Sequence, residues 1–568
     1  MVLIAALLAS LADASPVRVE IQGLDDVLSR NARAHLSLAA DSEQADLPES
    51  NVRALHARAP TELREALEPF GYYSPTIQSS LDLEGGTWVA RYTVDAGEPV
   101  IVDSVDIQLA GDGAEEPSLQ AALKTSTVRE GMVLRHDEYE RTKAALLSDA
   151  LEHGYRDAAF SESRIEVDPA ARAARIKLRL ETGTRYRFGK LTFEQNTLRP
   201  EFLQRYVHFE EGEPYDAKKL LDLQYALYDS EYFSAVEIIP GEPEGDRVPI
   251  VIRAEPRTRR NNYRVGGGYE TNTGPRVIIG WANRRLNSLG HRASVDMTLS
   301  EPEKDIEAQY RIPLKDPAKD SRVYAIHTGQ DDRGDTTSTI AELIARDTRQ
   351  LGAWQRQFYL RLPNERTEIG DTAFSTTSLI PGTLWTRTRA DDPILPMRGT
   401  FVSADLHGTG SWFGADTGFV QLRLDGRLVH PLGEKGRVVS RATVGATSVA
   451  DVDTLPASER FFAGGDQSIR GFDLDSLAPK NAEGLVAGGR YLLTGSFEYQ
   501  HTVRGPWGMA LFVDGGNAFN DIGDSFEYGA GVGVRYRTPL GMLRLDVAWP
   551  LTEGGDSWRI HFAFGPEL

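Results

Sequence analysis

The strongest constraint on the fold of this 568-residue chain is a two-residue alternation of apolar and polar side chains in its C-terminal half. From Arg257 onward, strand-length segments of this kind are separated by Gly, Pro, Asp and Asn, and helical spacing is absent. Clear examples are residues 354–362, 420–425, 543–549 and 559–564. A period of two places alternate side chains on opposite faces of a strand, so this region predicts a sheet with one apolar and one polar face.

An alternating sheet can pack as a soluble sandwich with its apolar face inward, or as a transmembrane barrel with that face toward lipid. Two features favour the barrel. Charged residues recur on the polar face deep within the strands, as expected for strands that line a wet lumen. Aromatic residues lie near strand ends, where membrane–water interfaces hold them: Trp281, Trp507, Trp549, Trp558 and Phe564.

The length of this region sets the size of the barrel. Residues 257–568 allow about 16 strands at about 20 residues per strand with its loop, although about 12 or about 18 strands fit the same count. No segment of the chain offers the roughly 18 consecutive apolar residues that a membrane-spanning helix requires. We therefore predict a transmembrane antiparallel β-barrel of about 16 strands over residues 257–568.

The N-terminal half differs, because a pattern of about 80 residues recurs three times within residues 17–256. Each copy opens with a strand, continues with apolar residues at helical spacing, and closes with two alternating strands. A β-α-α-β-β unit of this kind buries one face of a small sheet under its helices. We expect three such α+β domains, at residues 15–97, 98–184 and 185–256.

Two local features of these units bear on their use. The helical stretch ends in Gly71-Tyr72 in the first copy and Gly154-Tyr155 in the second, whereas the third has Tyr232-Phe233 at this step. Each small sheet would leave an exposed edge, which can accept an extended client chain by β-augmentation. A binding or spacing arm is therefore one interpretation, and a set of structural modules without client contact is the other.

Composition excludes several classes of function. The formal net charge is −20, which disfavours nucleic acid as a partner. There is no cysteine, so a thiolate nucleophile, a cysteine-based zinc site and a disulfide framework are excluded. The sequence lacks His-Glu-x-x-His, P-loop and Gly-x-Ser-x-Gly motifs, and its 11 histidines are scattered without ligand spacing. We predict that the protein is not an enzyme and uses no cofactor or metal.

The first residues have the pattern of a secretory signal. An apolar run from Val2 to Leu11 precedes Ala12-Asp13-Ala14, which has the small-x-small form of a signal-peptidase site. The run is too short to span a bilayer as a helix. We expect residues 1–14 to be a signal peptide, with a buried N-terminal helix as the alternative.

One stretch within the barrel region does not suit a lipid-facing strand. Residues 464–472, Gly-Gly-Asp-Gln-Ser-Ile-Arg-Gly-Phe, combine a glycine pair with charged side chains. Such a stretch suits a loop that folds to one defined place and inserts the guanidinium of Arg470 there. Arginine stays charged and offers a fork of donors that a carboxylate can meet bidentately. The composition of the stretch leaves open where the loop lies and what meets Arg470.

These features resemble those of the BamA/TamA superfamily of outer-membrane assembly factors and two-partner secretion transporters, and the N-terminal repeats resemble its POTRA domains. The loop motif is Ile469-Arg470-Gly471-Phe472, and a second segment, Phe512-Val513-Asp514-Gly515-Gly516, follows the family's Phe-x-Asp-x-Gly pattern. Glu498 matches the acidic residue on the strand after the loop. The resemblance implies that the loop folds back into the lumen, where Arg470 meets the barrel wall formed by Glu498, Phe512, Asp514 and Gly516.

Other segments extend the resemblance. Residues 286–291 are similar to the family's first hairpin, with Ser288 in place of the usual aromatic residue, and residues 392–399 are similar to a mid-barrel turn. The three repeats, together with C-terminal residues 564–568, resemble the TamA subgroup, whereas BamA-type chains usually carry five POTRA domains. The resemblance implies a protein of the bacterial outer membrane, with periplasmic POTRA domains, that helps to insert or secrete autotransporter-like and other β-barrel clients.

The resemblance also implies partners. These are a TamB-like periplasmic protein anchored in the inner membrane, which would contact the first POTRA domain, unfolded outer-membrane or autotransporter polypeptides, and outer-membrane lipid. A BamA-type general insertase, which would have more POTRA domains, is one alternative. A two-partner secretion pore, which would have two POTRA domains and a plug helix, is another.

In this family the first and last barrel strands meet at a seam thought to open laterally. Here the first strand would contain Val265 and Gly266, Gly267 and Gly268, and the last would contain Ile560, Phe562 and Phe564. Three consecutive glycines weaken a strand and remove side-chain packing. A weak seam and close packing against the contents of the lumen both account for them. We expect Val265 and Phe562 to lie near each other across the seam.

Overall fold

The computed structural model describes residues 14–42, 47–271, 274–539, 541–552 and 558–565. Residues 1–13 of the expected signal peptide and residues 566–568 of the C-terminal tail lie outside these ranges. The chain divides into two compact units, one comprising Met1–Thr192, Phe209–Asp222 and Ile238–Ile252, and the other comprising Phe193–His208, Leu223–Glu237 and Arg253–Leu568. No helix in the described ranges is long and apolar enough to cross a membrane.

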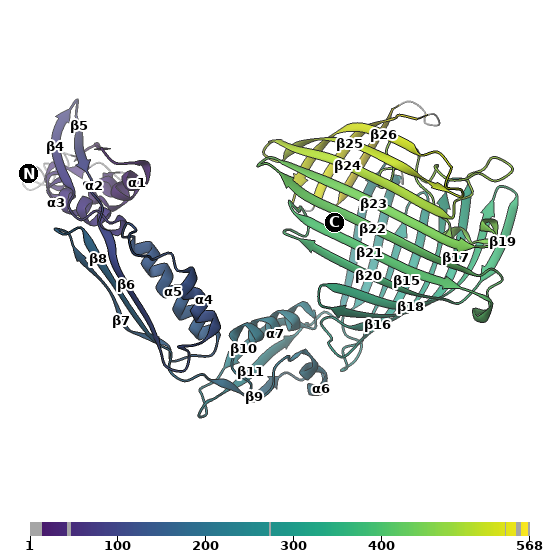
Figure 1. Cartoon of the computed structure of the whole chain (residues 1–568), viewed down its shortest axis with the longest axis horizontal. Coiled ribbons are helices and arrows are strands. Elements are labelled where there is room, and N and C mark those ends of the chain that lie inside the picture. The colour runs from purple at the N-terminus through teal and green to yellow at the C-terminus, as the bar shows by residue number, and fades with distance from the viewer. Residues whose placement is uncertain (1–13, 43–46, 272–273, 540, 553–557, 566–568) are drawn as a thin grey trace, which may run out of the picture. The chain divides into compact units, whose positions relative to one another are not determined.

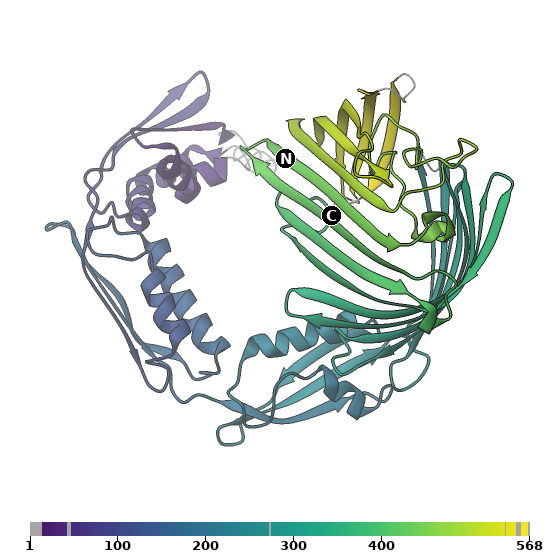
Figure 2. The same ribbon diagram turned by 45° about the vertical axis from the view of Figure 1, so that its right-hand side comes forward.

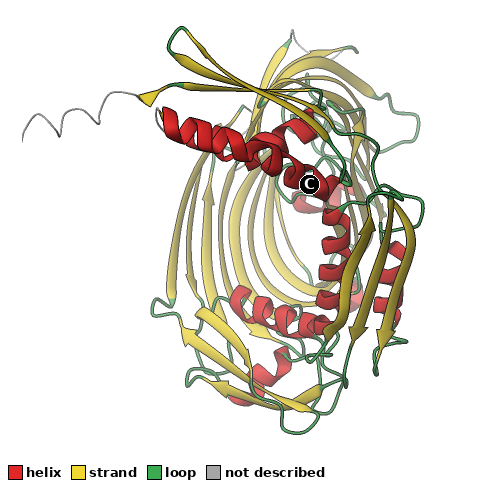
Figure 3. Cartoon of the chain, turned by 90° about the vertical axis from the view of Figure 1, so that its left-hand side faces the viewer, coloured by secondary structure: helices red, strands yellow, loops and turns green. Residues whose placement is uncertain are grey.

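The first two repeats each form a three-stranded sheet accompanied by helices (Figure 3). In both, the last strand is central, with the first strand parallel to it on one side and the second antiparallel on the other. A parallel pair needs a crossover connection, which the helices supply. The first repeat consists of β2 (Val17–Gln22), α1 (Asp26–His35), α2 (Ser37–Ser42), α3 (Glu49–Leu67), η1 (Glu68–Phe70), β4 (Thr76–Glu84) and β5 (Thr87–Asp95), with the short pair β1 (Ala14–Ser15) and β3 (Leu47–Pro48). The second consists of β6 (Ile101–Ala110), α4 (Pro117–Thr125), α5 (His136–Glu152), β7 (Ala159–Asp168) and β8 (Ala173–Glu181).

The third repeat has the strand order β10-β11-β9, so its last strand is again central. Apolar residues at helical spacing form its longest helix, as the sequence predicts. Its elements are β9 (Arg187–Glu194), α6 (Pro200–Leu203), η2 (Gln204–Tyr206), α7 (Ala217–Asp229), β10 (Phe233–Pro240) and β11 (Arg247–Pro256).

Backbone conformation explains why glycine precedes tyrosine at the end of the helical stretch in the first two repeats. Gly71 and Gly154 both have φ of 92°, a left-handed conformation that glycine adopts without strain. A Cβ on Gly71 would also lie 2.7 Å from the carbonyl oxygen of Leu134. The third repeat makes this turn at Glu231, with φ of 59°, which non-glycine residues adopt uncommonly. The step is therefore conserved in geometry among the three repeats but not in residue type.

Residues from Asn261 to Gly565 form one antiparallel sheet whose strands follow sequence order, and Figures 1 and 2 show its middle strands, in green, side by side. Two elements, β19 and β20, pair with β18 in one continuous register, in which Asn364 faces Thr377 and Arg361 faces Ile380. They are therefore one strand interrupted at residues 378–379, and the described sheet has 16 strands. This confirms the predicted fold, POTRA-like repeats followed by an antiparallel barrel of about 16 strands.

The bounds of the barrel elements are as follows. The strands are β12 (Asn261–Glu270), β13 (Gly274–Asn283), β14 (Arg292–Leu299), β15 (Glu303–Pro313), β16 (Ser321–Arg333), β17 (Thr336–Leu351), β18 (Trp354–Ile369), β19 (Thr372–Thr377), β20 (Ile380–Ala390), β21 (Gly399–Thr409), β22 (Phe419–Leu432), β23 (Gly436–Val449), β24 (Tyr491–Arg504), β25 (Trp507–Phe519), β26 (Glu527–Thr538), β27 (Gly541–Pro550) and β28 (Arg559–Gly565). The short helices are η3 (Ser411–Phe413), η4 (Val452–Thr454) and η5 (Ala457–Glu459).

Side chains along the barrel strands alternate between two environments. On β18, Phe358 and Leu360 are 49% and 40% exposed. Arg361, of opposite parity, bonds instead to Glu459 in a loop inside the barrel. The exposed face is apolar and the inner face is charged, which is the arrangement of a barrel in lipid and the reverse of a soluble sandwich.

Within the second unit, turns of the barrel contact residues of the third repeat. The hydroxyl of Tyr232 donates to the carbonyl oxygen of Gly290 at 2.6 Å, and the backbone N of Arg199 donates to the carbonyl oxygen of Ser288 at 3.0 Å. The segment 286–291, singled out in the sequence, is the turn that makes these contacts. Because β12 follows β11 directly, we term this end of the barrel the repeat end.

Candidate functional site in the barrel lumen

The loop between β23 and β24, residues 450–490, folds against the inner faces of barrel strands. Gly471 in this loop has φ of 101°, a conformation open to glycine. On β26, a Cβ on Gly529 would lie 2.0 Å from the carbonyl oxygen of Arg470. The backbone of the Arg470–Gly471 step therefore packs directly on strand backbone, and glycines on both sides of the contact leave room for it.

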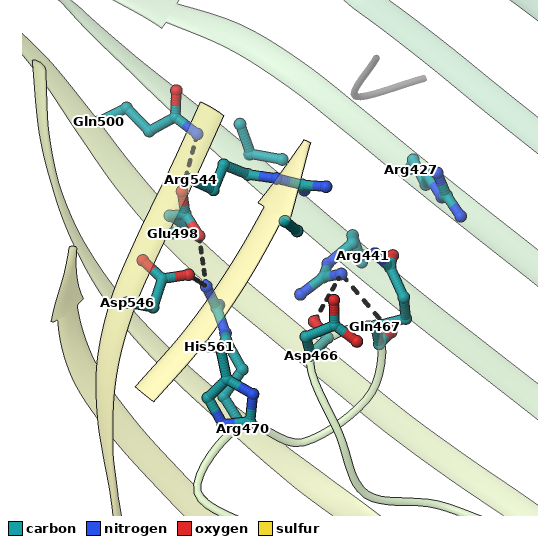
Figure 4. Close-up of a pocket in the computed structure, with 12 residues that line it drawn as sticks. Arg427, Arg441, Asp466, Gln467, Arg470, Glu498, Gln500, Arg544, Asp546 and His561 are labelled. Atoms are coloured by element: carbon teal, nitrogen blue, oxygen red, sulfur yellow. Dashed lines mark hydrogen bonds and ion pairs between the residues drawn. The ribbon is translucent and has the colours of Figure 1, made fainter. Parts of the chain in front are cut away.

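Arg470 extends from this loop to the barrel wall and is 3% exposed. Its Nε and Nη2 atoms donate to the two carboxylate oxygens of Asp514 on β25, at 2.7 and 2.9 Å. Its Nη1 atom donates to Glu498 on β24 at 2.7 Å and to Asp546 on β27 at 3.0 Å, as Figure 4 shows. Nη2 also donates to the hydroxyl of Ser496 at 3.3 Å. The five N–H groups of the guanidinium thus have five acceptors on the wall.

A second arginine completes this cluster. Arg535 on β26 donates to Glu498 at 2.6 Å through Nη2 and to Asp546 through Nη1. Three carboxylates and two guanidinium groups therefore meet, with side chains no more than 8% exposed. Burial of these charges costs solvation free energy, which their attraction and hydrogen bonds offset, so the cluster fixes position more than it adds stability. We term these five residues the Arg470 anchor: Arg470, Glu498, Asp514, Arg535 and Asp546.

Sequence reasoning placed three members of the anchor and missed two. Arg535 and Asp546 occupy inward positions of alternating strands, which is a signal available in the sequence. That signal marks many other lumen-facing charges equally, so it does not single these two out. The register of four neighbouring strands is what brings them to Arg470.

The other predicted loop and wall residues lie around the anchor. Ile469 and Phe472 are 0% and 2% exposed and pack in an apolar cluster with Phe461 and Leu492. The two remaining predicted wall residues, Phe512 and Gly516, have different roles. The guanidinium carbon of Arg470 lies 3.4 Å from the ring centre of Phe512, so the cation also contacts an aromatic face. Gly516 instead serves strand pairing, because a Cβ there would lie 2.0 Å from the carbonyl oxygen of Leu493 on β24.

A second charged contact, which sequence reasoning missed, holds an earlier part of the loop. Glu459, 2% exposed, accepts from Nη1 of Arg361 on β18 at 3.2 Å and lies 2.7 Å from Nε2 of His407 on β21. Gln421 on β22 donates to the backbone carbonyl of Glu459 at 2.8 Å. Arg361 also donates to Glu342 on β17 at 2.8 Å. We term Glu459, Arg361, His407 and Gln421 the Glu459 anchor.

The first and last strands, β12 and β28, meet at a seam. Across the residues that the structure describes, no backbone ladder joins these two strands. The backbone N of Phe562 donates to Oγ1 of Thr271 at 2.9 Å across the seam. On β12, Tyr263 is 73% and Val265 is 82% exposed. The described part of β12 therefore presents a backbone edge that is not laddered to β28.

The register at the seam differs from the expected one. Phe562 lies beside Thr271 rather than Val265, a shift of about 20 Å along the extended chain. Ile560 and Phe564 flank Phe562 on β28 and point outward, 46% and 44% exposed. The first and last strands are not joined by a turn, so no hairpin fixes their register.

The three glycines of β12 face open space. Among the described residues, a Cβ on Gly266 would meet nothing nearer than 3.8 Å, a Cβ on Gly267 nothing nearer than 3.9 Å, and a Cβ on Gly268 nothing within 4 Å. Close packing against the contents of the lumen therefore does not explain them. Their effect is to leave three consecutive positions of this strand without side chains beside its free edge.

The lumen loop also contacts the last strand. The backbone N of Gly471 donates to Nε2 of His561 on β28 at 3.1 Å, and Figure 4 shows His561 beside Arg470. Nη2 of Arg559 on β28 donates to Asp473 at 2.6 Å. Because Gly471 follows Arg470 directly, the Arg470 anchor positions one strand of the seam as well as the loop.

The contacts of the two anchors orient the lumen loop on the barrel wall. The ionic groups of both anchors bond to one another and so hold a loop against strands. Within the parts of the chain that the structure describes, no group of three or more His, Cys, Asp or Glu side chains is arranged to hold a metal ion.

Family models match both halves of the chain. The model described as the Omp85 superfamily domain matches residues 261–567. The model described as POTRA domain TamA domain 1 matches residues 18–96. A further POTRA model, described as surface antigen variable number repeat, matches residues 186–257.

Relatives with known names are similar over parts of the chain. Outer membrane protein assembly factor BamA of Nitratidesulfovibrio vulgaris is 24% identical over 392 residues, which cover 65% of this chain and 49% of that protein. Chloroplastic outer envelope protein 80 of Arabidopsis thaliana is 34% identical over 122 residues, which cover 19% and 15% of the two chains. The chain thus spans about half of BamA and less of the plant protein. The crystal structure of BamA from Haemophilus ducreyi lacking POTRA domains 1–3 shares the fold, with a TM-score of 0.67 and 16% identity over 81% of this chain and 99% of that one.

Proposed function

This chain belongs to the Omp85 superfamily, and from that premise we propose that it is an assembly factor that helps other proteins to enter or cross the outer membrane. Its barrel lies in the outer membrane, and POTRA domains precede it in the periplasm. We assign the three POTRA domains to residues 15–97, 98–184 and 185–256, and the barrel to residues 257–568. In this function the protein acts without enzymatic chemistry.

The observation that supports this function is the free edge of β12. Backbone N–H and C=O groups within a bilayer have no water to bond, so an edge that lacks a partner strand is costly there. An unfolded client strand satisfies these groups when it pairs with the edge, and the gain in free energy drives insertion without ATP. The glycines Gly266, Gly267 and Gly268 present no side chains that would obstruct an incoming strand.

The Arg470 anchor has a supporting role in the same mechanism. It holds the loop, and through Gly471 and His561 it holds β28, the strand on the other side of the seam. The anchor therefore keeps one side of the seam in place while the other side is free to pair with a client.

The finer proposal is a TamA-like role. In it the chain serves autotransporter-like and other β-barrel clients, and its first POTRA domain binds a TamB-like protein anchored in the inner membrane. The match of residues 18–96 to a TamA-type POTRA domain supports this role. Affinity purification from the native envelope tests it, because a large TamB-like protein should co-purify with the chain. Co-purification of lipoproteins instead would favour a BamA-type general insertase, the second candidate, which the similarity to BamA supports.

A reversible lock across the seam tests the assembly function. The chain has no cysteine, so Thr271→Cys with Phe562→Cys places a single pair of thiols where the two strands touch. In proteoliposomes that hold the purified chain, oxidation should lower the yield of a folded client barrel, and reduction should restore it. Unchanged yield from the oxidised protein would exclude passage through the seam.

A matched pair elsewhere in the barrel controls for the chemistry of the lock. Leu343→Cys with Leu362→Cys joins β17 and β18, which are already paired at these residues. Oxidation of this pair should leave the yield of folded client unchanged. A loss of yield here equal to that at the seam would mean that any cross-link impairs the barrel.

A further inference from the structure

A band of arginine side chains lies on the outer wall of the barrel at its repeat end. We term it the arginine band, and each member lies within the first or last four residues of its strand. The strand register places the central members side by side. Arg349 faces Arg356, and Arg356 faces Trp385, which lies two residues before Arg387 on β20. The band comprises Arg322 on β16, Arg349 on β17, Arg356 on β18, and Arg387 and Arg389 on β20.

The alternation of β18 shows that this band faces lipid. Arg361 points into the lumen, where it bonds to Glu459. Arg356 has the opposite parity and points outward, together with the exposed side chains of Phe358 and Leu360. Residues that face each other in neighbouring strands share a side of the sheet, so the partners of Arg356 in β17 and β20 point to lipid as well.

Few carboxylates accompany the band. Arg322 and Arg349 both bond to Asp347, at 2.8 and 3.1 Å. In the turn after β20, Asp391 and Asp392 accept bonds from backbone N–H groups of their own turn. Among the described contacts, one carboxylate therefore bonds to two of the five arginines, and no carboxylate bonds to the other three. This excess of positive charge is local, since the formal net charge of the chain is −20.

Two members of the band lie over aromatic rings. The guanidinium carbon of Arg356 is 4.3 Å from the ring centre of Phe358, and that of Arg387 is 5.7 Å from the ring centre of Trp354. The Nε atoms of Arg356 and Arg387 are buried and have no hydrogen-bond partner among the described residues. An arginine on the lipid face is costly at the bilayer midplane but nearly neutral near the interface. The position of the band near strand ends therefore suits the level of the headgroups.

An apolar groove adjoins the band on the same wall. Tyr324 follows Arg322 by two residues, and Ala345 precedes Asp347 by two, and both line the groove. The groove therefore begins about 7 Å from the arginines along the strands. Further lining residues are Trp281, Tyr310, Ile326, Leu343 and Leu360.

We infer that the arginine band and this groove bind an anionic phospholipid of the periplasmic leaflet. The phosphate accepts hydrogen bonds from the guanidinium groups, which suit phosphate geometry bidentately. An acyl chain lies in the groove, and Trp354 and Trp385 lie at headgroup level, as interfacial aromatic residues do. The arginine band is separate from the client seam, because β13, β14 and β15 stand between β12 and β16.

Native mass spectrometry of the full chain tests this site. The protein is released from micelles that contain equal amounts of phosphatidylglycerol and phosphatidylethanolamine, and wild type should retain phosphatidylglycerol preferentially. Arg356→Gln and Arg387→Gln should each weaken that retention, and the double variant should weaken it about tenfold, since each arginine near an anionic headgroup contributes modestly. Equal retention of the two lipids by wild type, or full retention by the double variant, would overturn the inference.

Two further variants make the result specific. Arg366→Gln changes an arginine on the same face of β18 toward the other end of the strand, where Arg366 pairs with Glu368 at 2.5 Å, and it should retain lipid as wild type does. An equal loss in this variant would indicate a general charge effect and contradict the site. Arg356→Lys keeps the charge and should retain most of the phosphatidylglycerol. Heat-dependent gel mobility shows that the barrel of each variant is folded.

Discussion

Two clusters of buried charge, of opposite polarity, hold the lumen loop against the barrel wall. At the Arg470 anchor a cation from the loop meets carboxylates of the wall, and at the Glu459 anchor an anion from the loop meets an arginine and a histidine of the wall. The Arg470 anchor involves β24 to β27, and its neighbour Gly471 bonds to β28 at the seam. The Glu459 anchor involves β18, β21 and β22, away from the seam. A hydrogen bond of the neighbouring residue thus links the Arg470 anchor to the seam strand, and we propose that this anchor affects the seam whereas the Glu459 anchor affects only the loop.

The largest effect is expected from Arg470→Ala. It leaves Asp514 buried without its arginine, while Glu498 and Asp546 keep their bonds to Arg535. Breaking a buried ion pair of this kind costs about 3–5 kcal/mol. The barrel should still insert, because its strand pairs are intact, but client assembly should fall severely. The yield of folded client in proteoliposomes measures this.

A matched variant separates this effect from the loss of any lumen arginine. Arg423 on β22 bonds to Asp425 at 3.1 Å and is about half exposed, so Arg423→Ala should assemble clients at the wild-type rate. A fully active Arg470→Ala variant would refute the role of the anchor in assembly.

A smaller effect is expected from Glu459→Ala. Arg361 keeps its bond to Glu342, so the main cost is a buried donor without its partner, about 1–3 kcal/mol. The loop should become more sensitive to proteolysis in intact proteoliposomes, while client assembly stays near the wild-type level. If Glu459→Ala abolished assembly as completely as Arg470→Ala, the two anchors would not differ in function.

A still smaller effect is expected from His561→Ala. This change removes the acceptor of the N–H group of Gly471, which is worth about 1 kcal/mol. Amide hydrogen exchange of β28 should become faster, because the strand loses a contact to the loop, and exchange of β18 should not change. Unchanged exchange in β28 would show that the bond between Gly471 and His561 does not hold the seam strand.

The smallest effect is expected from Gly267→Ala on β12. The added Cβ would meet no atom of the described residues nearer than 3.9 Å, and alanine in a strand is more stable than glycine by about 0.5–1 kcal/mol. The thermal unfolding temperature of the barrel should stay the same or rise slightly. The contrasting control is Gly516→Ala, which should lower it, because that Cβ would lie 2.0 Å from a carbonyl oxygen.

Alternation along the strands predicted the barrel and which residues face the lumen. A motif within the sequence then selected Arg470, Glu498 and Asp514 from the many inward charges. No motif marks Arg535, Asp546 or the residues of the Glu459 anchor. The parity of a position along a strand predicts that its side chain faces the lumen, but not which other side chain it contacts. That depends on the stagger of all strands around the barrel, which is a property of the closed sheet.

The register at the seam could not be predicted for a related reason. Neighbouring strands such as β17 and β18 are joined by a short turn, which fixes their pairing. Phe562 and Thr271 are far apart in sequence, and no turn relates their strands. The expected contact between Val265 and Phe562 was therefore wrong by several residues.

Pairing of a client strand with the edge of β12 is the claim on which the proposed function depends. Single cysteines at Tyr263, Val265 or Tyr269, in a chain that has no other cysteine, can be cross-linked to a client with one cysteine in its last strand while assembly is under way. Each position should form a disulfide with a different client residue, displaced along the client by as many residues as the positions differ along β12, as an antiparallel ladder requires, and Leu343→Cys on β17 should form none. Complete client assembly without any cross-link to β12 would contradict the proposed function.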